Sequence, residues 1–122
     1  MTVCLIVEDS GVVRKAVRRI IQEFSFDRIH ETENGLEALE FCQKELPDVI
    51  ILDWNMPLMN GLEFLIAMRK LENGHKPKVI FCTTENNLSH IQKALMAGAD
   101  EYIMKPFDKS IIQEKLEQVG II

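Results

Sequence analysis

Three short apolar runs in this sequence end abruptly in acidic or hydroxyl residues. Residues 3–7 run into Glu8 and Asp9, residues 49–52 into Asp53, and residues 79–82 into Thr83, Thr84 and Glu85. A short apolar run bounded by polar residues is typical of a strand buried on both faces of a parallel sheet. Because functional groups in such sheets gather at the carboxyl ends of the strands, several carboxylates are expected to meet at one edge.

The size and composition indicate one globular domain over residues 1–122. The chain is 47% hydrophobic with a formal charge of -5, so a general attraction to nucleic acid or anionic membranes is not expected. Cys4, Cys42 and Cys82 are odd in number, far apart and set among apolar neighbours, which predicts buried, reduced thiols. No apolar stretch has the length of a membrane span and no secretory signal is recognisable, so a cytoplasmic protein is expected.

Strand-like and helix-like segments alternate five times along the chain. A polar second strand is expected at 28–32 and a fifth short strand at 101–104. The helix after the first strand has Ser10 as its N-cap and Val12 among its apolar positions, the third helix has Ile66 among them, and the last helix has Asp108 as its N-cap. This alternation predicts an α/β fold with a flavodoxin-like, five-stranded parallel sheet in the order 2-1-3-4-5 and five helices on both faces.

In that strand order the first and third strands are neighbours, so Glu8 and Asp9 lie beside Asp53. Like charges at contact distance cost on the order of 4 kcal/mol per pair at an effective dielectric near 20, so a positive group is required. The ammonium of Lys105, at the end of the fifth strand, and a divalent metal are the two candidates. Oxygen ligands with solvent access favour Mg²⁺, held by Glu8, Asp9, Asp53 and the backbone carbonyl of Asn55.

A carboxylate beside Mg²⁺, a lysine and a hydroxyl is suited to accept a phosphoryl group. Such transfer needs in-line positioning and stabilisation of charge on the equatorial oxygens. Asp53 is the candidate nucleophile, and Lys105 and the Thr83 hydroxyl are the candidate contacts to the phosphoryl oxygens.

These residues resemble the receiver domain of bacterial two-component response regulators along the whole chain. The resemblance is carried by Glu8-Asp9, 53–57 (Asp-Trp-Asn-Met-Pro), 83–85 (Thr-Thr-Glu), Gly98-Ala99, Tyr102 and 105–107 (Lys-Pro-Phe). Because the sequence stops after the fifth helix, it is most similar to stand-alone receivers of the chemotaxis CheY type.

The resemblance implies a phosphoacceptor switch that catalyses its own phosphorylation and dephosphorylation. The phosphoryl group would come from a phosphohistidine of a sensor histidine kinase or a histidine phosphotransfer protein. Thr83 and Tyr102 would then rearrange and change the surface formed by the fourth helix, fifth strand and fifth helix, to which a downstream protein binds. That surface is expected to include His90, Ile91, Tyr102, Met104 and Lys115.

Other functions remain open from the residues alone. A phosphorelay intermediate or phosphate sink would use the same site without an output target, and a docking module would not need phosphorylation. A phosphatase like the haloacid dehalogenase group would need a second Asp where Asn55 stands. A flavin carrier would need a phosphate-binding loop where Glu8 and Asp9 would repel the ligand.

Two residues depart from the usual receiver pattern. Glu8 stands where many relatives have Asp, which keeps an oxygen ligand on a longer side chain. Thr84 stands where the family has a small residue beside the phosphoryl site. Thr84, Glu85 and Asn55 are therefore the residues expected to tune the rates.

Replacing Thr84 with Ala is expected to speed both self-phosphorylation from small phosphodonors and hydrolysis of the product, because the β-branched side chain hinders access. Time courses of labelling and decay measure both rates, and unchanged rates would refute this role for Thr84.

Overall fold

The computed structural model describes residues 2–83 and 88–122, in which strands and helices alternate five times. The strands are β1 (Val3–Val7), β2 (Arg28–Thr32), β3 (Val49–Asp53), β4 (Lys78–Thr83) and β5 (Glu101–Met104). The helices are α1 (Gly11–Ile21), α2 (Gly35–Lys44), α3 (Gly61–Arg69), α4 (Leu88–Met96) and α5 (Lys109–Gln118). All strand pairs are parallel, in the order β2-β1-β3-β4-β5, which confirms the predicted fold.

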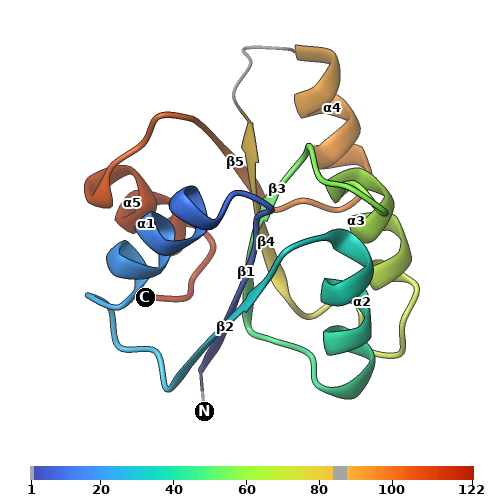
Figure 1. The fold of residues 1–122 in the computed structure, drawn as a ribbon, viewed down its shortest axis with the longest axis horizontal. Helices are drawn as coiled ribbons and strands as arrows, with labels where there is room; N and C mark the ends of the chain where they lie inside the picture. The colour runs from blue at the N-terminus through green and yellow to red at the C-terminus, as the bar shows by residue number, and fades with distance from the viewer. Residues whose placement is uncertain (1, 84–87) are drawn as a thin grey trace.

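The sheet separates two layers of helices, α1 and α5 on one face and α2, α3 and α4 on the other (Figure 1). Alternate residues of the central strands supply the two cores. Leu5 of β1 and Leu52 of β3 belong to the core beneath α2 to α4, whereas Ile6 and Ile51 belong to the core beneath α1 and α5. Burial on both faces explains why β1 and β3 appear in the sequence as continuous apolar runs.

Val12 in α1 and Ile66 in α3 differ from the sequence prediction. Val12 is 83% exposed and Ile66 is 43% exposed. In α1 the buried side is set by Val17 and Ile21, and helical geometry places Val12 on the opposite side. In α3, Phe64 takes the core position on the opposite side from Ile66. The prediction failed there because a helix with apolar residues on several sides does not reveal which side packs on the sheet.

Side-chain caps begin the helices that follow β1 and β5. The Ser10 hydroxyl accepts a hydrogen bond from the Val13 amide at 3.3 Å, and the Asp108 carboxylate accepts one from the Ile111 amide at 3.1 Å, as the sequence predicts. The three cysteines are buried and free, which also agrees with the prediction. Within the described ranges, no helix combines the length and the apolar character needed to cross a membrane.

Candidate functional site

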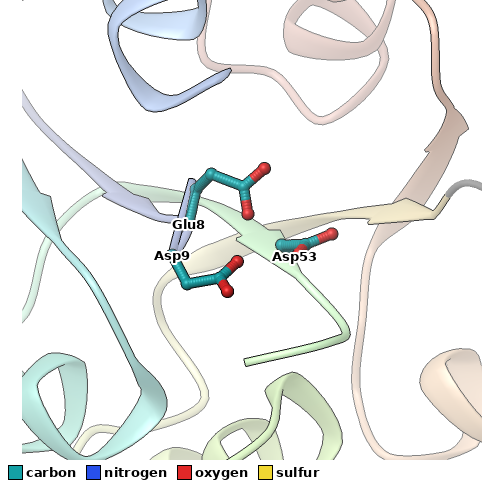
Figure 2. Close-up of side chains that lie close together, drawn as sticks. All are labelled: Glu8, Asp9 and Asp53. Atoms are coloured by element: carbon teal, nitrogen blue, oxygen red, sulfur yellow. The ribbon is translucent and has the colours of Figure 1, made fainter. Parts of the chain in front are cut away.

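Three carboxylates from two neighbouring strand ends form an acidic cluster at the carboxyl edge of the sheet. Val7 pairs with Leu52, so the residues that follow β1 come beside Asp53, the last residue of β3. Carboxylate oxygens of Glu8, Asp9 and Asp53 all lie within 4.8 Å of one another. Figure 2 shows the three side chains close together at the ends of β1 and β3. Glu8 and Asp53 are buried, whereas Asp9 is exposed to solvent. The cluster is therefore shielded on one side and open on the other.

Lys105 supplies a positive charge to this cluster. Its Nζ donates a hydrogen bond to Glu8 Oε1 at 2.7 Å and another to Asp53 Oδ1 at 3.1 Å. The residue directly follows β5, and its backbone amide donates to the Thr83 carbonyl at 2.7 Å. That bond ties the base of the lysine to the end of β4. The ammonium thus reaches across β4 to the two buried acids.

Burial and mutual charge set the protonation of this group of residues. Burial, followed by the neighbouring Asp53 carboxyl, raises the pKa of Glu8 to about 7, although Lys105 acts in the opposite direction. Burial by itself would lower the pKa of Lys105, but its bonds to Glu8 and its attraction to Asp53 raise it overall. The lysine therefore stays charged, and the carboxyl of Glu8 is protonated more readily than that of an ordinary glutamate.

The donor set fits a hard divalent cation. Glu8 Oε2 is buried and has no hydrogen-bond partner among the described residues, which is costly for a carboxylate oxygen unless a cation or proton reaches it. The exposed side of Asp9 leaves space for the water ligands that Mg²⁺ retains. Asn55 lies exposed in the loop two residues after Asp53, close in sequence to the cluster. Glu8, Asp9 and Asp53 could therefore hold Mg²⁺ together.

Thr83 lies at the end of β4, next to the strand that ends in Asp53, and Tyr102 lies on β5. Asp53 pairs with Cys82, and Thr83 is the next residue of β4, buried at the same edge of the sheet. Tyr102 is half-buried and pairs with Phe81. Both side chains line a small apolar cavity beneath α4. Thr84 and Glu85, the expected rate-tuning residues, lie outside the described residues.

The residues expected to bind a partner occupy α4, β5 and α5 but differ in exposure. Met104 is exposed, and Lys115 Nζ lies 5.6 Å from the centre of the Tyr102 ring and 3.2 Å from Glu101 Oε1. His90 is half-buried against Trp54, at a ring separation of 4.3 Å. Ile91 is buried, contrary to the surface role expected from the sequence, because it packs into the core as one of the anchors of α4.

Gly61 is a residue beside the site that the sequence motifs did not single out. It opens α3, and its amide donates to the Trp54 carbonyl at 2.9 Å. A Cβ atom at this position would overlap the carbonyl oxygen of Asp53. The available signal was a glycine directly after the capping residue Asn60. Gly61 thus allows α3 to begin against the backbone of the acidic cluster.

Replacing Glu8 with Gln is expected to stabilise the metal-free protein at pH 8 by on the order of 1 to 3 kcal/mol. The pKa of Glu8 is about 7 in the fold and 4.5 ordinarily, so between these values the folded state binds more protons than the unfolded state. Stability from Glu8 is therefore present below pH 4.5 and lost as the pH rises to about 7.

Chemical denaturation in chelator from pH 5 to 8 measures this effect. As the pH rises, the free energy of unfolding of Glu8→Gln should increase relative to that of the unchanged protein. Mg²⁺ affinity should fall in the same variant because a ligand oxygen is lost. A constant difference in stability across the pH range would contradict the raised pKa of Glu8.

Replacing Gly61 with Ala is expected to destabilise the fold by about 1–3 kcal/mol, because the new methyl group forces the Asp53 backbone or α3 to move. Gly11→Ala is the matched control, since Gly11 also opens a helix but a Cβ there meets only an Arg14 nitrogen at 3.7 Å. Thermal unfolding and Mg²⁺ titration of both variants provide the measurement. Equal effects of the two substitutions would show that Gly61 does not matter for the site.

Comparison with known proteins finds one family that matches most of the chain. The response regulator receiver domain model matches residues 4–117. A chemotaxis protein CheY homolog of Campylobacter jejuni is 38% identical over 116 residues, which are 94% of this chain and 89% of that protein. Chemotaxis protein CheY1 of Helicobacter pylori is 35% identical over 116 residues, 94% of each chain.

Solved structures that resemble this chain also include chemotaxis proteins. The chemotaxis protein CheY4 of Vibrio cholerae superimposes with a TM-score of 0.90 at 33% identity, covering 98% of both chains. The matched segment contains the acidic cluster, Lys105 and Thr83, and the strand order is the one that brings them together. The chain therefore belongs to the receiver-domain family of two-component response regulators, with CheY proteins among its relatives.

Proposed function

We propose that this receiver accepts a phosphoryl group on Asp53 from a phosphohistidine of a histidine kinase or phosphotransfer protein. The observation that carries the proposal is the position of the Asp53 carboxylate. It lies among Glu8, Asp9 and Lys105, with one of its oxygens 3.1 Å from the Lys105 ammonium. A nucleophilic carboxylate needs such an arrangement, in which fixed positive charge stabilises the incoming phosphoryl oxygens.

The transfer is an in-line displacement at phosphorus. An Asp53 oxygen forms the new P–O bond while the P–N bond to the donor imidazole breaks, and the imidazole leaves with the bonding electron pair and takes up a proton. Lys105 is placed to follow the charge from the free carboxylate to a phosphoryl oxygen, since its Nζ already bonds to Asp53. Thr83, at the end of the adjacent strand, is the residue that we propose for the hydroxyl contact to a phosphoryl oxygen.

Glu8, Asp9, Asp53 and the carbonyl of Asn55 are the residues that would hold Mg²⁺. Bound there, the ion would neutralise charge on the phosphoryl oxygens during transfer. Hydrolysis of the resulting acyl phosphate by water returns the Asp53 carboxylate and inorganic phosphate. The exposed side of the cluster, at Asp9, gives both donor and water a path to Asp53.

The α4-β5-α5 face is the surface on which we propose that phosphorylation acts. An open groove of about 420 Å³ lies on the β5-α5 part of this face, lined by 102–106, Ile111 and Lys115. Its wall contains Tyr102 and, at one end, Lys105, so the site and the groove share a residue. This continuity favours an output switch that acts on a downstream protein over a phosphate sink. The proposed location of this interaction is the cytoplasm.

Formation of an acyl phosphate tests the proposal directly. The protein is incubated with acetyl phosphate and Mg²⁺, and intact mass and hydroxylamine sensitivity are followed. One phosphoryl group is expected per chain, and its loss is expected in chelator and in Asp53→Asn. Asp27→Asn is the matched control, since Asp27 precedes β2 at the opposite edge of the sheet. Labelling that persists in Asp53→Asn would overturn the assignment of the phosphoacceptor.

A further inference from the structure

The indole of Trp54 connects the acidic cluster to α4. Trp54 directly follows Asp53, and it is the single tryptophan of the chain. Its ring stacks on His90 with a centroid separation of 4.3 Å and an interplanar angle of 8°, and it also contacts the Phe81 ring at 5.2 Å. The indole is thus held between β4 and the first turn of α4. A displacement of the backbone at Asp53 would move this ring.

The two ends of α4 are attached to the fold in different ways. At the C-terminal end, Arg69 donates two hydrogen bonds to the Gly98 carbonyl, at 2.6 and 3.2 Å, and the Ala99 amide donates to Ala94 at 3.0 Å. Along the helix, only Ile91 and Ala94 are buried. The first turn, nearest the acidic cluster, meets Trp54 through His90. A motion of α4 that pivots about its C-terminal end would therefore have to slide or break the ring stack.

The cavity beneath α4 makes such a motion necessary for the proposed switch. Trp54 and His90 form part of its wall, together with Thr83, Ile91 and Tyr102. The cavity measures about 10 Å³, which is room for no more than one water molecule. An inward turn of the Tyr102 ring, or a shift of Thr83, therefore requires the wall to move. The part of the wall that belongs to α4 and touches Trp54 is His90.

We propose that the His90–Trp54 stack is a latch that holds α4 in the arrangement belonging to the free Asp53 carboxylate. This inference rests on the proposed phosphoacceptor function, because it concerns the equilibrium that phosphorylation shifts. The stack stabilises the state in which Lys105 bonds to Asp53 and the cavity beneath α4 is small. An aromatic stack of this kind changes an equilibrium constant by roughly two- to tenfold. His90 is thus a positioning residue that sets how readily the receiver switches.

Beryllofluoride with Mg²⁺, a mimic of the acyl phosphate, provides the probe. By linkage, weakening the latch raises the affinity for whatever binds the switched state, since more of the protein is competent before binding. His90→Ala is therefore expected to bind beryllofluoride roughly two- to tenfold more tightly than the unchanged protein. His90→Phe, which retains a stacking ring, should remain close to the unchanged protein. Gln92→Ala is the control for an exposed alanine substitution in α4.

Binding is measured by fluorine NMR, and amide hydrogen exchange reports on α4. In His90→Ala without the probe, exchange in the first turn of α4 should approach that of the beryllofluoride-bound unchanged protein. Equal affinities and equal exchange responses in His90→Ala and Gln92→Ala would overturn the latch, as would a weaker affinity in His90→Ala. Failure of the unchanged protein to bind beryllofluoride would overturn the proposed function itself, which separates the two outcomes.

Discussion

The ammonium of Lys105 stands between two buried carboxylates, and this contact makes the site possible. Glu8 and Asp53 follow neighbouring strands and are both buried, and without a cation their repulsion would cost on the order of 4 kcal/mol at an effective dielectric near 20. Lys105 bonds to both from the end of β5. The strand order, the length of β5 and the backbone bond between Lys105 and Thr83 all serve to place this one nitrogen.

The same contact explains why the receiver can respond to chemistry at Asp53. A ligand that accepts a hydrogen bond from the Lys105 ammonium competes with its bonds to Glu8 and Asp53. The change also reaches the end of β4, where the Lys105 amide bonds to the Thr83 carbonyl. The central strands are buried on both faces, so they do not absorb such a change easily. The weakly buried helix α4, by contrast, has few anchors. A rigid sheet and a loosely held helix together allow a local charge change to be expressed at the surface.

Much of the fold was predictable because burial on both faces leaves a plain sequence pattern. The runs at 3–7, 49–52 and 79–82 lie in β1, β3 and β4, and the predicted order of all five strands is the observed one. The helix faces were predicted less well. Val12 and Ile66 are apolar yet exposed, since a run of apolar residues in a helix does not indicate which side meets the sheet. The buried position of Ile91 was also missed, because burial depends on how α4 lies on the sheet.

The sequence by itself determined the α/β fold and the gathering of Glu8, Asp9, Asp53 and Lys105 at one edge, because acids that end buried parallel strands have no other place to lie. Only the tertiary structure decided how readily Glu8 ionises. Burial, together with the neighbouring Asp53 carboxyl, raises the pKa of Glu8, whose second oxygen is buried without a hydrogen-bond partner among the described residues. The stack of His90 on Trp54 was likewise invisible in the sequence. Its residues lie on different elements, and their contact depends on how α4 packs beside β3 and β4, which no local pattern encodes.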